Sequence, residues 1–268
     1  MMKRAARWLL VAALLVAPVV PHQAWAQIQP HRAEYSLRLG TAVNATRIGR
    51  AVQDITLDCS GWRIMREVTV DVSLTPSLKI NVKSRLEGEE ALSAPTFTYR
   101  TFQVLNGVER ETSGKVARKN GELLVETATP DGPDKAVLPP MTLMPVAAVS
   151  YLISRLSLGV SPLFSLLMFG AEGTVGAYLL EVKELDSGAF QTVPPALKRV
   201  DVPSPRSWPL LATVSRAGQP DDKPLLTLKA RIFASGVLDR LTIDAGPVTV
   251  AAYLQALEMH PLPTCPVP

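Results

Sequence analysis

The stretch His31-Arg32-Ala33-Glu34-Tyr35-Ser36-Leu37-Arg38-Leu39 decides the fold class, because its apolar and polar residues alternate. Successive side chains of a β-strand point to opposite faces, so this stretch has one apolar face and one charged face. A strand with one dry and one wet face is typical of an antiparallel sheet.

The same alternation recurs along the chain, over residues 68–72, 78–85 and 226–234. Asn106-Gly107 and Asn120-Gly121 lie between strand-like runs and predict tight hairpins, because both residue types tolerate a positive φ. The pattern therefore predicts an all-β protein built as a meander of antiparallel strands.

Two segments have helical spacing instead. After Pro145, apolar residues recur at i, i+3, i+4 and i+7, which predicts a helix over residues 145–158 that Gly159 can end. We expect this helix to pack against the sheet, and its buried residues to be Leu152, Ile153 and Leu156. Similar spacing predicts a second short helix from Thr249 to Glu258.

The apolar run continues from the first helix to Phe169, which raises the alternative of a membrane span. Arg155, Gly159 and Pro162 lie in the middle of that run and argue against a span. The sequence favours a buried helix followed by a loop.

The N-terminus predicts an export signal over residues 1–26. Three basic residues precede an apolar run from Trp8 to Val20, and Ala24-Trp25-Ala26 supplies the small residues of a cleavage site. The alternative is an uncleaved anchor, for which the run is short. Residue 27 is Gln rather than Cys, so we expect no lipidated mature terminus. No linker divides residues 27–268, which predicts a single domain in the periplasm.

Charge excludes one class of partner. The whole chain has 28 Lys+Arg and 24 Asp+Glu, a net charge of +4. Cleavage would remove Lys3, Arg4 and Arg7 and leave a net charge of about +1. A nucleic-acid-binding function is therefore not expected.

The chain has two cysteines, Cys59 and Cys265. In an oxidising compartment two cysteines most simply pair with each other, which would bring the C-terminal tail back to an early strand. The rival interpretations are a redox pair and a catalytic thiol, but the sequence has no Cys-x-x-Cys.

The histidines of the mature chain, His31 and His260, lie near its two ends. A catalytic triad would need one of them, and a zinc site built from them and the cysteines has no local ligand spacing. The sequence also has no Gly-x-Ser-x-Gly, P-loop or dinucleotide fingerprint.

The acidic group Glu87, Glu89 and Glu90 could indicate the paired carboxylates of a glycosidase. Gly88 between them predicts instead a solvated turn at a strand end. We therefore expect no enzymatic activity, no metal and no cofactor.

Several segments together resemble the EipB-like family of periplasmic cell-envelope integrity proteins, and they cover nearly the whole mature chain. These segments are His31-Arg32-Ala33-Glu34-Tyr35-Ser36-Leu37, Cys59-Ser60-Gly61-Trp62, Leu143-Met144-Pro145-Val146, Leu166-Leu167-Met168-Phe169-Gly170, Ser207-Trp208-Pro209, Gly236-Val237-Leu238 and Cys265. Three positions depart from the family pattern, because Val146, Ser235 and Ala245 replace its usual Thr, Asn and Tyr.

The resemblance implies a strongly bent, spiral-like antiparallel sheet, or half-barrel, with one or two short packed helices and a Cys59–Cys265 disulfide. It implies a non-catalytic periplasmic protein that supports envelope integrity through protein–protein contacts, with a periplasmic tetratricopeptide-repeat protein as a partner. The alternative function is a carrier or sensor of a lipid or lipoprotein acyl chain on the concave face of the sheet. In either case we expect the protein to be peripheral to the membrane at most.

Overall fold

The computed structural model describes residues 28–266 except 74, 76–78, 160–162, 173, 191–196, 198 and 219–223. The predicted export signal, residues 1–26, and the predicted mature start at residue 27 lie outside the described residues.

Fourteen antiparallel strands join into one sheet in the order β8-β7-β6-β5-β4-β3-β2-β1-β14-β13-β12-β11-β10-β9. Neighbours in the sheet are neighbours in sequence except at the centre, where β1 pairs with β14. The strands are β1 (His31–Leu39), β2 (Arg47–Leu57), β3 (Gly61–Ser73), β4 (Lys79–Ala91), β5 (Phe97–Leu105), β6 (Val108–Lys119), β7 (Glu122–Thr129), β8 (Gly132–Leu138), β9 (Leu163–Gly170), β10 (Gly176–Glu184), β11 (Ser207–Arg216), β12 (Leu226–Phe233), β13 (Leu238–Asp244) and β14 (Thr249–Met259).

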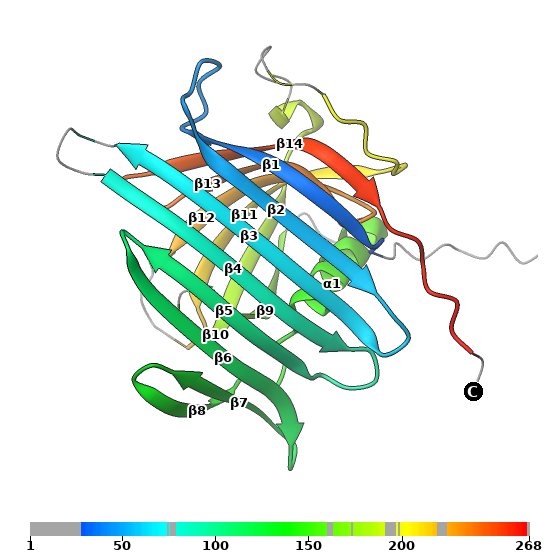
Figure 1. Cartoon of the computed structure of the whole chain (residues 1–268). Helices are drawn as coiled ribbons and strands as arrows, with labels where there is room; N and C mark the ends of the chain where they lie inside the picture. Colours follow the sequence, from blue (N-terminus) through cyan, green and yellow to red (C-terminus); the bar gives the residue numbers. More distant parts are fainter. Residues whose placement is uncertain are drawn as a thin grey trace, which may run out of the picture.

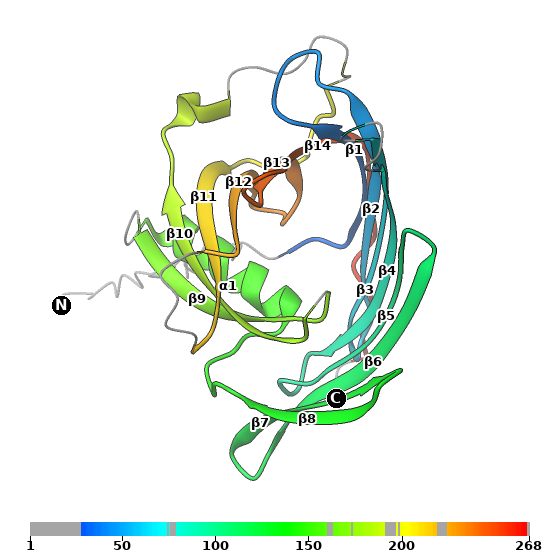
Figure 2. The same ribbon diagram turned by 90° about the vertical axis from the view of Figure 1, so that its left-hand side faces the viewer.

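The sheet bends strongly without closing into a barrel, and Figure 2 shows its two halves curling around a common interior. The predicted all-β class and spiral-like antiparallel sheet are confirmed. The two predicted hairpins also form, with φ of 51° at Asn106 and 53° at Asn120, and each Asn is followed by a glycine of positive φ.

The predicted helix forms over the expected residues as α1 (Pro145–Leu158) and ends at Gly159, which has a φ of 60°. It lies inside the bend of the sheet (Figures 1 and 2). Ile153 and Leu156 are buried as expected, whereas Leu152 is only partly buried against the same core.

An aromatic cluster connects the two halves of the sheet beside α1. The ring of Phe169 on β9 lies 5.9 Å from that of Phe97 and 5.6 Å from that of Tyr99, both on β5. Two glycines make room for these rings: a Cβ on Gly88 would lie 2.5 Å from the Phe97 ring, and one on Gly114 would lie 2.4 Å from the Tyr99 hydroxyl. Gly88 is therefore inside strand β4, and its prediction as a turn residue was wrong.

The loop expected after the first helix is also wrong, because residues 163–170 form strand β9. The segment before α1 covers part of the outer edge of this strand, since Leu143 pairs in parallel with Met168. Among the described residues, no helix has the length and apolar character needed to cross a membrane.

The second predicted helix, Thr249 to Glu258, is instead strand β14. The helix-like spacing of its apolar residues comes from a β-bulge. Tyr35 pairs with Leu254 and Glu34 with Ala256, which leaves Gln255 as an extra residue. The extra residue shifts the alternation by one, so Leu254 and Leu257 share a face and imitate the i, i+3 spacing of a helix.

The position of Ile153 in the core predicts a large loss when its side chain is shortened. Ile153→Ala should lower the free energy of unfolding by about 2–5 kcal/mol, because it leaves a cavity between α1 and the sheet. Leu158→Ala is the matched control, since Leu158 is 67% exposed on the same helix and should change stability by about 0.5 kcal/mol or less. Equal effects of both variants in urea unfolding would contradict this account of the core.

Candidate functional site

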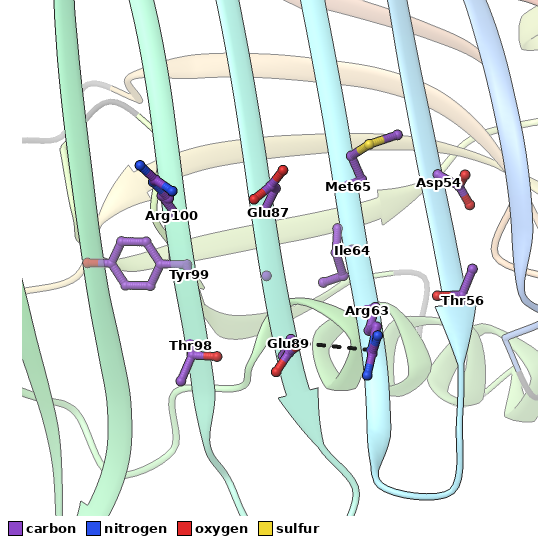
Figure 3. Close-up of a pocket in the computed structure, with 11 residues that line it drawn as sticks. Asp54, Thr56, Arg63, Ile64, Met65, Glu87, Glu89, Thr98, Tyr99 and Arg100 are labelled. Atoms are coloured by element: carbon purple, nitrogen blue, oxygen red, sulfur yellow. Dashed lines mark ion pairs between the residues drawn. The ribbon is translucent and has the colours of Figure 1, made fainter.

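A shallow hollow of about 540 Å³ lies on the sheet face opposite α1, across strands β2 to β5 (Figure 3). Alternation along each strand places its polar side chains on this outer face, and the strand register brings them side by side. The residues that line it are Asp54, Thr56, Arg63, Ile64, Met65, Glu87, Gly88, Glu89, Thr98, Tyr99 and Arg100.

The charges in and around the hollow form a ladder of ion pairs. Arg63 Nη2 lies 3.2 Å from Asp58 Oδ2, and Arg63 Nε lies 3.8 Å from Glu89 Oε1. Arg100 Nε lies 2.7 Å from Glu111 Oε1. These side chains are about half exposed or more, so each pair adds only about 0–1 kcal/mol to stability. We call Asp58, Arg63, Glu89, Arg100 and Glu111 the charged ladder.

Figure 3 shows Glu87 and Glu89 on this outer face, and strand alternation turns Glu90 the other way. The prediction of three solvated carboxylates was wrong for Glu90, which is only 6% exposed. Glu90 Oε2 accepts a hydrogen bond from the Val146 N–H at 2.7 Å, and Oε1 accepts one from the Ala147 N–H at 2.8 Å.

Glu90 thus caps a helix that has no cap of its own. The residue before α1 is Met144, which offers no side-chain oxygen to the first N–H groups. Burial raises the pKa of Glu90 above its ordinary value, and the two N–H donors oppose that rise. The acidic side chain of Glu90 also interacts favourably with the positive end of the helix dipole.

The histidines do not form a catalytic group with these carboxylates. His31 is buried, its Nδ1 lies 2.7 Å from the Gln29 carbonyl oxygen, and burial lowers its pKa. His260 Nε2 lies 2.8 Å from Asp54 Oδ1 at the border of the hollow. Within residues 28–266 and their gaps, no group of three or more His, Cys, Asp or Glu side chains is placed to hold a metal ion.

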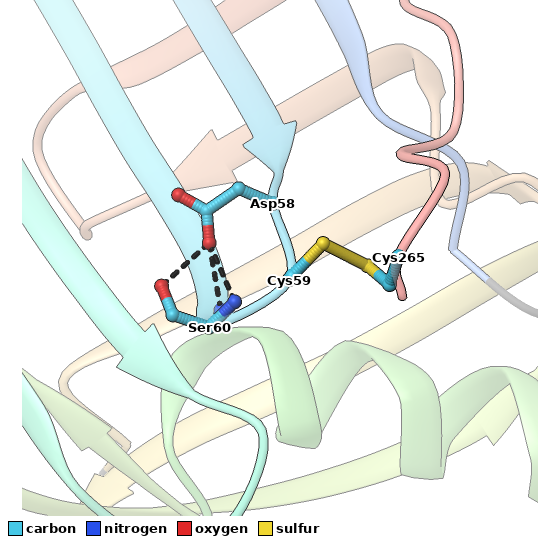
Figure 4. Close-up of a disulfide and its surroundings, with 5 residues drawn as sticks. Asp58, Cys59, Ser60 and Cys265 are labelled. Atoms are coloured by element: carbon cyan, nitrogen blue, oxygen red, sulfur yellow. Dashed lines mark hydrogen bonds between the residues drawn. A yellow bond between two sulfur atoms is a disulfide. The ribbon is translucent and has the colours of Figure 1, made fainter. Parts of the chain in front are cut away.

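Both cysteines are joined in a disulfide between the β2–β3 turn and the C-terminal tail (Figure 4). Their Cα atoms lie 5.5 Å apart although the residues are 206 positions apart in sequence. Asp58 Oδ1 organises the turn by accepting a hydrogen bond from the Ser60 N–H at 2.8 Å, and hydrogen bonds from Ser60 lower the pKa of Asp58. The tail returns to an early strand, as the pairing requires, and the His260 N–H donates to the Pro30 carbonyl at 2.9 Å.

The three departures from the family pattern lie at three different places. Val146 is buried in the first turn of α1, and Ser235 is buried in the β12–β13 turn, where its carbonyl accepts the Gln29 N–H at 3.0 Å. Ala245 lies in the β13–β14 turn, and its N–H donates to the Val248 carbonyl at 3.1 Å. None of them lines the hollow.

Sequence reasoning did not single out Arg63 or Arg100, although both lie in alternating segments. Alternation could have placed them on a wet face. The structure shows in addition that Arg63 lies opposite Glu89 and that Arg100 reaches Glu111, which lies opposite Phe102.

Comparisons with known proteins identify a matching family and a similar solved structure. A protein-family model described as EipB-like matches residues 22–261. A crystal structure of a beta-barrel-like protein of the domain of unknown function DUF1849 from Brucella abortus is similar, with a TM-score of 0.72 and 16% sequence identity. The similarity covers 88% of this chain and 99% of that one. No curated protein matches the sequence.

The disulfide predicts a clear loss of stability on reduction. Cys59→Ser and Cys265→Ser should each lower the free energy of unfolding by about 2–5 kcal/mol, because the unfolded chain regains the freedom of a long loop. The double variant should equal either single one, since all three remove the same bond. Two titratable thiols in unfolded, unreduced wild-type protein would contradict the pairing.

The buried Glu90 predicts a pH dependence of stability. The folded-state pKa of Glu90 is raised above the unfolded value near 4.5. Protonated Glu90 therefore favours the folded state. This contribution to the free energy of unfolding is complete below the unfolded value and is lost as the pH rises through the folded-state pKa. Glu90→Gln cannot ionise, so its free energy of unfolding should lack this fall when measured by urea unfolding at a series of pH values. Glu89→Gln removes an exposed carboxylate from the same strand and is the control. An identical pH slope in wild type and Glu90→Gln would contradict the assignment.

Proposed function

Because this chain belongs to the EipB-like family, we propose that it is a non-catalytic periplasmic protein that supports cell-envelope integrity through protein–protein contacts. The observation that carries this proposal is the charged ladder around an open hollow on the outer face of the sheet. Arginine and exposed apolar side chains are enriched where proteins bind each other. The hollow combines Arg63 and Arg100 with Met65, and Phe102 is 39% exposed beside them.

The geometry of the acidic residues supports a role without catalysis. A glycosidase needs two carboxyl groups that face each other across a cleft, one of them kept protonated by apolar surroundings. Glu87 and Glu89 lie side by side on an open face, and the buried Glu90 is on the other face with both its oxygens bonded to α1. The cysteines are joined, so the disulfide-bonded protein offers no thiol nucleophile.

The proposed partner is a periplasmic tetratricopeptide-repeat protein, the class that the family resemblance implies. A ladder with both signs of charge would select a partner of complementary pattern and would fix its register. We expect such a complex to weaken as salt rises, since the side chains of the ladder are exposed.

Charge reversal in the ladder tests the proposal. Arg63→Glu with Arg100→Glu should lower capture of partner proteins from native envelope extracts by about tenfold or more, and should fail to rescue the envelope-stress defect of a deletion strain. The control is Arg110→Glu with Lys135→Glu, because both residues are exposed, ion-paired cations on β6 and β8. Rescue by the ladder variant at normal abundance, despite lost capture, would contradict the proposal.

A second candidate function, the carriage or sensing of an acyl chain, is favoured by the end of the concave face away from α1. The inner side chains there form an apolar cluster separate from the helix core. Its buried members are Leu37, Ile48 and Ala252. Val68, Val70 and Val250 of the same cluster are only partly buried. Native mass spectrometry of protein purified from periplasm would show a co-purified lipid if this function holds, and a clean protein mass would contradict it.

A further inference from the structure

One end of the sheet exposes aliphatic side chains at its hairpin tips. Antiparallel order places the β1–β2 and β5–β6 turns at the same end, away from α1 and the disulfide. Val43 in the first turn is 50% exposed, and Leu105 and Val108, which flank the second, are 54% and 72% exposed. Exposed aliphatic side chains therefore lie at two hairpin tips of this end, and strands β3 and β4 separate the two tips.

Basic side chains lie beside these tips on the outer face. Arg38 is opposite Arg47 on the neighbouring strand, and Thr69 lies between Arg50 and Lys83. Lys79 belongs to the same group. Two acidic residues lie at this end as well: Asp71, opposite Asn81, and the exposed Glu109, which follows Val108. We call Arg38, Arg47, Arg50, Lys79 and Lys83 the basic end.

The cations of the basic end differ from those of the charged ladder. Arg63 and Arg100 of the ladder each lie within ion-pair distance of a carboxylate, as does the nearby Arg85. In the part of the chain that the structure describes, no cation of the basic end forms such a pair. Arg38 donates to the Ala45 carbonyl at 2.8 Å and Arg47 to the Gly49 carbonyl at 3.4 Å, and neither contact neutralises a charge. Arg38 is partly buried, whereas Arg47, Arg50, Lys79 and Lys83 are exposed, so the charges of these four remain available to an outside anion.

We propose that the basic end and its hairpin tips dock on a membrane surface that is rich in anionic phospholipid. The cations would meet the lipid phosphates while Val43, Leu105 and Val108 enter the head-group layer. Basic residues beside inserted aliphatic groups are the combination that holds proteins on such surfaces. A nucleic acid would use the cations but would gain nothing from the aliphatic tips, and an acidic protein would leave those tips in water. This inference goes beyond the proposed function and does not depend on it.

Vesicle co-sedimentation tests the proposal with protein purified from the periplasm of cells that express the whole chain. The probe is a vesicle of equal parts phosphatidylglycerol and phosphatidylethanolamine, and the comparison is a vesicle of phosphatidylcholine alone. We expect binding to the anionic vesicles that weakens with added salt, and little binding to the neutral ones. No binding to the anionic vesicles at low salt would overturn the proposal, and so would equal binding to both.

Two variants separate the electrostatic part from the apolar part. Arg47→Gln with Arg50→Gln should lower the partition coefficient about 30-fold, roughly fivefold for each cation. Val108→Ser should lower it about tenfold and should leave the salt dependence in place, because it removes only apolar contact.

Matched controls lie at the other end of the molecule. Lys115→Gln with Lys119→Gln removes two exposed cations from β6, and Met141→Ser changes a residue that is 76% exposed before α1. Both should bind like wild type, and all variants should show wild-type melting temperatures. Weakening by the controls to the same degree as by the test variants would overturn the proposed location.

Discussion

The apolar inner face of the bent sheet has to be removed from water, and the rest of the structure depends on how this is done. Helix α1 covers the part of that face where the Phe97 and Phe169 rings meet. Since the helix has no cap in its own sequence, the carboxylate of Glu90 supplies one from strand β4. Helix and sheet therefore fix each other: the sheet holds the first turn of the helix, and the helix keeps that part of the sheet dry.

Much of this fold could be predicted from patterns of neighbouring residues in the sequence. Alternation identified β1, and Asn-Gly pairs identified two hairpins, because each signal depends on neighbouring residues alone. The helix over residues 145–158 was visible for the same reason. Strand β14 was not, because the extra residue Gln255 becomes a bulge only when β1 lies beside it.

The candidate site was less visible for a related reason. The role of Glu90 depends on its contacts with Val146 and Ala147, which lie 56 and 57 positions later in the chain. No residue near Glu90 in the sequence indicates these contacts. Likewise, the strand register places Arg63 opposite Glu89 and Glu87 opposite Arg100, which brings these charges together around the hollow. Alternation in the sequence indicates which residues of a strand share a face, and pairing between strands decides which of these residues meet.

The central pairing of β1 with β14 has a consequence for biogenesis. Strand β14 follows all the other strands of the sheet in sequence, so the middle of the sheet can form only after those strands have been synthesised. Until then β1 and β13 present unpaired backbone at their edges, which is the state that invites aggregation. Contacts between the two ends of a sequence also slow folding, because a large loop must close first. We therefore expect the new chain to fold slowly, and its disulfide to form late rather than to guide the early steps.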